Sequence, residues 1–171
     1  MPECDQAPWV ESALETYERP LLRYAMRWCR GDLERARDAV QDTFLRLCSQ
    51  PREQVEDHLA QWLFTVCRNR LIELLRKEGR MEPLSDTDLA VRPASDPDPA
   101  AHSEHRDRVQ TVTELLTELP ERQQELIRLK FQENLSYKEI SAITTLSVTN
   151  VGFLLHTGIQ ALRRRLRELE A

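Results

Sequence analysis

Apolar residues recur at three- and four-residue steps along most of this 171-residue chain, a spacing typical of amphipathic helices. The first apolar stripe consists of Trp9, Val10, Ala13, Leu14, Tyr17, Leu21, Leu22, Ala25 and Trp28. Pro20 falls inside this stripe and predicts a break or a bend there, because proline has no amide hydrogen to donate along a helix. The chain therefore begins with one interrupted helix or two short ones.

Capping residues mark the helices that follow. Gly31 predicts the end of the first helical stretch, and Asp32 predicts the N-cap of a helix over residues 33–48. The apolar side of that helix consists of Ala36, Val40, Phe44 and Leu47. A loop is expected over residues 49–57 and another amphipathic helix over residues 58–77.

The composition changes after this block. Residues 81–105 contain Pro83, Pro93, Pro97 and Pro99 among Ser, Asp and Ala, with few large apolar groups. Such a segment reads as an acidic, flexible linker rather than a core element. The expected fold class is all-α, with two small helical domains at residues 9–80 and 106–171 joined by this linker.

The C-terminal domain carries a helix-turn-helix pattern. Pro120 opens one helix, Glu133-Asn134 predicts a turn, and Ser136 with Glu139 forms a capping box. Ser147 predicts the cap of the next helix, whose contacts with the preceding one would involve Ile140, Ile143, Leu146, Val151, Leu154 and Leu155. The pattern fits a DNA-reading helix pair, and it also fits an ordinary helical hairpin.

Thr145 lies in the turn of this pattern, at a position where glycine is common. A β-branched residue with positive φ is strained. We therefore expect the turn to be built without a positive φ at Thr145.

Charge and composition narrow the function classes. The net charge of −5 argues against a free-standing DNA binder that depends on phosphate neutralisation. No run of 18 apolar residues occurs, and the acidic N-terminus does not resemble a signal peptide, so a cytoplasmic protein without membrane insertion is expected.

Candidate chemistry is sparse. No two of the cysteines Cys4, Cys29, Cys48 and Cys67 form a C-x-x-C pair, which argues against a zinc site. They read as small apolar fillers, with a redox switch as the alternative. The four histidines do not cluster with them or with a Ser and an Asp in a recognisable order, so we expect no catalytic residue, metal or cofactor.

Residues 37–47 and 62–76 resemble regions 2.2 to 2.4 of a bacterial sigma factor, and residues 119–123 and 135–162 resemble region 4. Two such blocks joined by a short linker resemble the extracytoplasmic-function branch of the sigma-70 superfamily. The resemblance implies a non-enzymatic subunit that binds core RNA polymerase, through the β′ clamp helices and the β flap, and directs it to promoter DNA. It also implies that an anti-sigma factor is a possible partner.

The resemblance further implies roles for individual residues. The residues implied to contact the clamp helices are Asp38, Gln41, Asp42 and Phe44. Asp38 and Asp42 also fit a solvated helix face. The minus-ten element would meet Trp62, Arg68, Asn69, Arg70, Arg76, Lys77 and Arg80. Trp62 fits a core position as well as a stacking platform for an unpaired base.

The second helix of the pattern departs from the family. Relatives carry several Lys or Arg at positions that correspond here to Gly152, Leu154 and Thr157. The remaining minus-thirty-five candidates are Ser147, Thr149, Asn150, His156, Arg163 and Arg164. Weak or unusual recognition of that element is expected.

Two other functions compete with the sigma factor hypothesis. A sigma-like antagonist or adaptor would bind polymerase or a regulator without reading DNA, and the poorly basic helix favours it. A stand-alone repressor would bind duplex DNA without polymerase, which the net charge of −5 disfavours.

Overall fold

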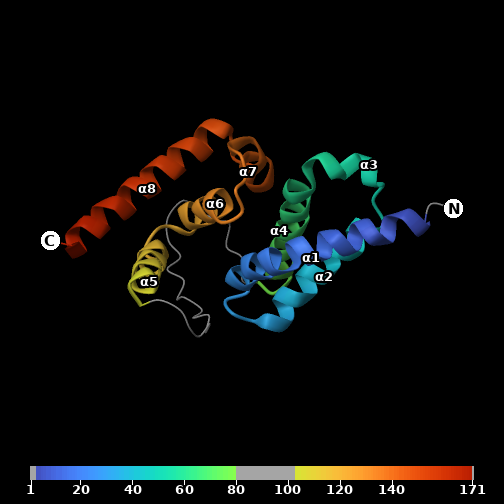
Figure 1. Ribbon diagram of the computed structural model, residues 1–171, viewed down its shortest axis with the longest axis horizontal. Coiled ribbons are helices and arrows are strands. Elements are labelled where there is room, and N and C mark those ends of the chain that lie inside the picture. The colour runs from blue at the N-terminus through green and yellow to red at the C-terminus, as the bar shows by residue number, and fades with distance from the viewer. Residues whose placement is uncertain (1–2, 80–102, 171) are drawn as a thin grey trace. The chain divides into compact units, whose positions relative to one another are not determined.

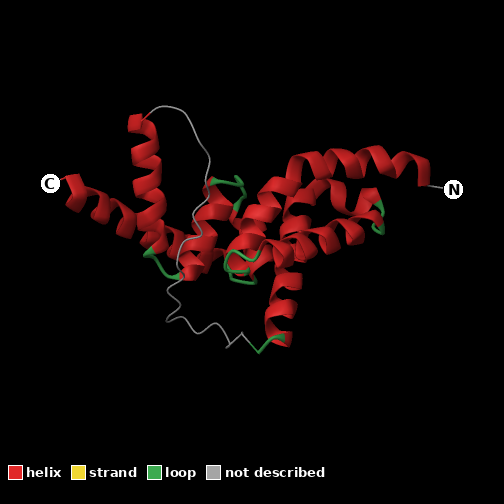
Figure 2. Ribbon diagram, turned by 90° about the horizontal axis from the view of Figure 1, so that it is seen from below, coloured by secondary structure: helices red, strands yellow, loops and turns green. Residues whose placement is uncertain are grey.

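The computed structural model describes residues 3–79 and 103–170, and every regular element within those two ranges is a helix (Figures 1 and 2). The chain divides into two compact units, one holding residues 1–83 and 142–145 and the other residues 84–141 and 146–171. The expected all-α class is confirmed. Within the described ranges, no single helix is long and apolar enough to cross a membrane.

Three long helices build the first unit. Helices α1 (Glu3–Trp28), α2 (Leu33–Cys48) and α4 (Leu59–Lys77) all pack against one another. Helix α1 continues through Pro20 without ending there, so the predicted break is absent. Apolar residues on both sides of Pro20, including Ala13 and Leu21, are buried, and this packing compensates for the missing hydrogen bond.

The connection from α1 to α2 follows the prediction. Gly31 has a φ of 86°, and its amide donates to the carbonyl of Met26 at 2.9 Å, a bond that closes the end of α1. The Asp32 carboxylate then accepts a hydrogen bond from the amide of Arg35 at 3.2 Å. This cap starts α2 at Leu33, as expected.

The expected loop at residues 49–57 is largely helical. It contains a short helix α3 (Arg52–Val55) and a 3₁₀ turn η1 (Glu56–His58). Val55 is buried and anchors the segment to the first unit. One buried side chain in an otherwise polar stretch gives too weak a period to predict a helix from the sequence.

A compact apolar core joins the three long helices. Its fully buried members include Leu21, Ala36, Leu47, Leu63, Phe64 and Leu71. The ring of Tyr24 meets the ring of Phe64 edge to face, with centroids 5.4 Å apart. This core fixes which faces of α2 and α4 point outward.

The second unit contains α5 (Ser103–Thr117), α6 (Glu121–Phe131), the beginning of α7 (Tyr137–Thr144) and α8 (Val148–Glu170). Helix α8 packs against α5 and α6. Gly158 lies at this contact, and a Cβ there would be 3.1 Å from Cδ1 of Ile127 on α6, so a larger residue would require the Ile127 side chain to shift. Helix α5 begins three residues before the predicted domain boundary at residue 106, and residues 80–102 of the predicted linker lie outside the described residues.

Candidate polymerase and promoter interfaces

The helix-turn-helix is present in the second unit. The amide of Ser136 donates to Glu139 Oε2 at 2.7 Å, and the amide of Glu139 donates to Ser136 Oγ at 3.3 Å, so the capping box at the start of α7 is confirmed. The amide of Asn150 donates to Ser147 Oγ at 3.1 Å, which confirms the cap of α8. The chain bends by 104° between α7 and α8, within the usual range for this motif.

The turn between these helices differs from the expectation. Thr145 has a φ of 61°, so the β-branched residue does adopt the left-handed conformation that we expected it to avoid. Ile143 before the turn and Val151 after it are both buried. The Thr145 hydroxyl donates to the carbonyl of Thr144 at 2.6 Å.

One stripe of α8 faces solvent. It consists of Thr149, Phe153, His156 and Gln160, with Asn150 beside it. The segment 148–162 contains no Lys or Arg. The cations come later, at Arg163 and Arg164, which are both exposed.

Gly152 and Thr157, where the resemblance predicts basic residues, lie beside this stripe rather than on it. A Cβ on Gly152 would lie 3.5 Å from the ring of Tyr137 on α7. The Thr157 hydroxyl accepts a hydrogen bond from Gln123 of α6 at 3.0 Å. Both positions therefore border on neighbouring helices of the same unit.

The outward face of α2 carries part of the predicted polymerase set. Asp38 and Gln41 are exposed and Asp42 is partly exposed. Phe44 is only 6% exposed, so its ring packs in the core and the expected exposed aromatic is absent. Leu45, which is 58% exposed, supplies an apolar group on the outer surface instead.

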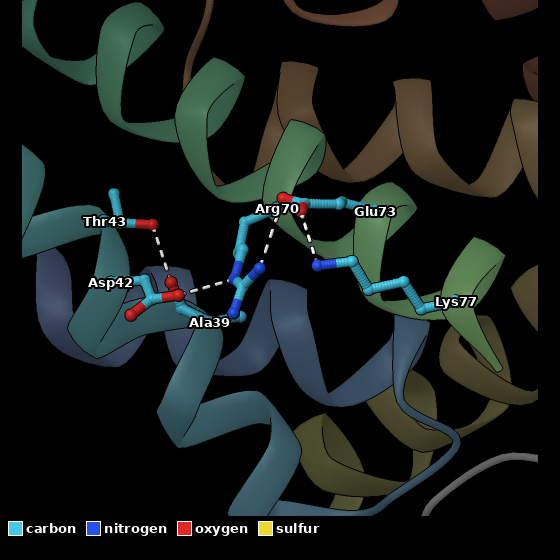
Figure 3. A network of polar contacts seen from close by, with 6 residues as sticks. All are labelled: Ala39, Asp42, Thr43, Arg70, Glu73 and Lys77. Atoms are coloured by element: carbon cyan, nitrogen blue, oxygen red, sulfur yellow. Dashed lines mark hydrogen bonds and ion pairs between the residues drawn. The ribbon is translucent and has the colours of Figure 1, made fainter.

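Asp42 belongs to a polar network that joins α2 to α4 (Figure 3). Its Oδ2 lies 2.5 Å from Nε of Arg70, and Nη1 of Arg70 donates to Glu73 Oε2 at 3.2 Å. Glu73 Oε1 also lies 2.9 Å from Nζ of Lys77. Hydrogen bonds from Lys77 and Arg70 lower the pKa of Glu73 below its usual value.

Arg68 does not lie on an open DNA path. Its side chain is buried, and its guanidinium stands over the ring of Trp28 at 5.3 Å from the centroid. Asn69, Arg76 and Lys77 are exposed on α4, as a contact with nucleic acid requires. Arg80 lies outside the described residues.

Trp62 is partly exposed and lines a shallow groove between α2 and α4. The groove is lined by Asp42, Leu45, Arg46, Ser49, Gln50, Trp62 and Val66. Trp62 is therefore neither fully in the core nor fully open, and its ring borders the same surface hollow as Leu45.

The cysteines differ in their surroundings. Burial raises the pKa of the Cys67 thiol to about 12 and that of Cys29 to about 11. Cys67 fits the filler interpretation, whereas Cys48 is exposed and does not. None of the three forms a disulfide.

Two family models match the chain. The model for Sigma-70 region 2 matches residues 13–81, and the model for Sigma-70, region 4 matches residues 110–169. The first match covers α2 through α4 and most of α1, and the second covers α6 through α8 with part of α5.

Curated relatives and a solved structure agree with these models. The ECF RNA polymerase sigma factor EcfG of Rhodopseudomonas palustris is 32% identical over 133 residues, which span 77% of this chain and 71% of that protein. The ECF RNA polymerase sigma factor RpoE of Cereibacter sphaeroides is 32% identical over 108 residues, spanning 63% of this chain but only 58% of that protein. The sigma factor RpoE of Bartonella quintana, crystallised with the anti-sigma factor NepR, has the same fold at a TM-score of 0.66 and 23% identity, over 92% of this chain and 96% of that chain.

The chain belongs to the sigma-70 family, in its extracytoplasmic-function branch. The family expected from the sequence is thereby confirmed, and with it the function of promoter-specific transcription initiation.

Proposed function

We propose that this sigma factor binds core RNA polymerase through the outward face of α2 and contacts promoter DNA through the exposed ends of α4 and α8. The observation that carries the polymerase half is the exposed stripe Asp38, Gln41 and Leu45 on α2. These residues recur at three- and four-residue steps, opposite the buried side of the helix. An apolar centre flanked by polar groups is typical of protein interfaces.

The promoter half divides between the two units. Asn69, Arg76 and Lys77 are the candidates for the minus-ten element, and the exposed stripe of α8 with Arg163 and Arg164 is the candidate for the minus-thirty-five element. Exposed cations near a strand-separated region suit the backbone of unpaired DNA. Ser147 would act there through its cap on α8 rather than through a base contact.

In this proposal the polymerase performs the chemistry and the chain itself is not an enzyme. Its site of action is the cytoplasm, where bacterial polymerase and promoters are found. An anti-sigma factor is a further partner class, since the matched Bartonella chain is crystallised with one. Loss of transcription on adding an inhibitor encoded beside this chain would support that part.

The polymerase interface is tested by co-elution of the full chain with core polymerase on a sizing column. Asp38→Ala and Leu45→Ala should weaken the complex. Glu15→Ala and Leu14→Ala are matched controls on α1, because both residues are exposed and neither lies on α2. Equal effects of the two pairs would contradict the α2 interface.

The absence of Lys and Arg from residues 148–162 favours one alternative function, that of an antagonist. An antagonist that occupies polymerase would co-elute with it and give no transcript from any promoter. Transcription with reconstituted holoenzyme separates the two functions directly.

A further inference from the structure

The first two turns of α8 expose Val148, the first residue of the helix, at 44%, and one aromatic side chain, Phe153. Phe153 is 63% exposed, whereas Val151 and Leu155 on the same turns are 0% and 1% exposed. Val151 and Leu155 therefore fill the buried face of α8, and the ring of Phe153 does not contribute to the core. In a helix-turn-helix, the outward face of these turns is the one that meets base edges in the major groove.

The neighbours of Phe153 on this stripe are polar, and none of them is Lys or Arg. Thr149 precedes it by one turn and His156 follows it by one turn, and no Lys or Arg occurs over residues 148–162. The bidentate cationic contact with guanine, the commonest specific contact in the major groove, is therefore missing here. The one apolar group that bases offer in that groove is the C5 methyl of thymine, and a phenyl ring suits it.

Cations follow on the same face of the helix. Arg164 lies eleven residues after Phe153, and eleven residues make about three turns, so both point to the same side about 16 Å apart. Arg164 and Arg163 are exposed, as phosphate contacts require. Val148 and Tyr137, which borders Gly152, are also exposed at this end of α8, at 44% and 42%. The stripe that carries Phe153 nevertheless continues with polar Thr149, His156 and Gln160, which suits base edges better than an apolar protein partner.

We infer that Phe153 is a specificity-determining residue that reads a thymine methyl in the minus-thirty-five element. This inference rests on the proposed entry of α8 into promoter DNA. An apolar contact with thymine takes the place of a cationic contact with guanine on this part of α8, and the downstream arginines hold the phosphates.

The test uses holoenzyme assembled from the full chain and core polymerase. The holoenzyme is used to select binding sites from a promoter library randomised over the minus-thirty-five element. The selected sequences should share a thymine at one or more positions. Replacing that thymine with uracil removes only the methyl group and should weaken binding about fourfold. Phe153→Ala should lose both the thymine preference and the sensitivity to uracil.

Phe131→Ala is the matched control, because Phe131 is 62% exposed and lies at the end of α6, outside α8. It should keep the preference and the sensitivity of the unchanged chain. An unaltered thymine preference in Phe153→Ala would overturn the inference. So would a loss of polymerase binding by Phe153→Ala with the same preference, which would make Phe153 a protein contact.

Failure of the proposed sigma factor function gives a different result from failure of the inference about Phe153. A chain that yields no promoter-dependent transcript would refute the proposed function itself. Transcription without any upstream sequence preference would leave the proposed polymerase contacts standing and overturn both the reading of the minus-thirty-five element by α8 and the role of Phe153. An upstream preference that Phe153→Ala leaves unchanged would overturn the role of Phe153 alone.

Discussion

Asp42 on α2 and Arg70 on α4 form an ion pair, with 2.5 Å between Oδ2 and Nε, that ties two helices of the first unit together. The resemblance to sigma factors assigned Asp42 to polymerase and Arg70 to DNA. In the folded chain each is the other's partner, and Arg70 also bonds Glu73. The pair links the two proposed interfaces and belongs to the scaffold that holds them.

Removing this pair should affect stability as well as binding. Asp42→Asn should lower the free energy of unfolding of the first unit by about 1 kcal/mol, because both side chains are partly screened by solvent. Asp38→Asn, on the same helix but exposed, should leave it unchanged. All tryptophans lie at positions 9, 28 and 62, so tryptophan fluorescence during urea unfolding reports on this unit alone.

A double-mutant cycle with Arg70→Gln then isolates the pair. The loss in the double variant should be smaller than the sum of the two single losses. Strict additivity would mean that the contact contributes nothing to stability.

The turn between α7 and α8 stores backbone strain at Thr145. Thr145→Gly should stabilise the helix-turn-helix by about 1 kcal/mol, because glycine adopts a φ near 61° without steric cost. Slower hydrogen exchange across α7 and α8 would measure the gain. Thr113→Gly, in the body of α5, is the control and should destabilise its helix by about 0.3 kcal/mol. Faster exchange in Thr145→Gly would refute the strain.

Arg68 and Arg76 should give opposite results when substituted. Arg68→Met should destabilise the first unit by about 1 to 2 kcal/mol through loss of the contact with Trp28. Arg76→Met should leave stability unchanged and weaken binding of the holoenzyme to a forked minus-ten DNA. Urea unfolding and fluorescence anisotropy measure the two effects; a selective DNA defect in Arg68→Met, with normal stability, would contradict its structural role.

Cys67 should make folding sensitive to alkaline pH. Its pKa is about 12 in the folded chain against 9.0 for an unperturbed thiol, so above pH 9.0 the unfolded state loses a proton that the folded state keeps. Its contribution is therefore complete below pH 9.0 and falls as the pH rises toward about 12. Cys67→Ala should flatten the decline by about 1 kcal/mol between about pH 9 and about pH 10; parallel curves for the two chains would count against the effect.

Much of the fold could be predicted from local signals. The Asp32 cap and the apolar side of α2 predicted its bounds, and the Ser136–Glu139 capping box predicted the start of α7. These features depend on neighbouring residues only, so spacing is enough to find them. The helical turns at α3 and η1 were missed because a single buried residue, Val55, holds them.

The residues of the polymerase and promoter interfaces were harder to predict, because they depend on which face of each helix is buried in the core. Phe44 and Arg68 matched the family pattern, but packing among α1, α2 and α4 buries both. Phe153 was not among the predicted DNA contacts, because the resemblance to sigma factors directs attention to polar and basic side chains. Its offset of two residues from Val151 and from Leu155, both core positions, is the signal that predicts its exposure.

The most direct test of the central claim is transcription by holoenzyme reconstituted from this chain and core polymerase of the same organism. Genomic fragments serve as templates, and the transcript ends are mapped by sequencing. We predict a discrete set of start sites, each preceded by shared minus-ten and minus-thirty-five sequences and absent with core polymerase alone. Polymerase that binds the chain yet starts no additional transcript would contradict the account.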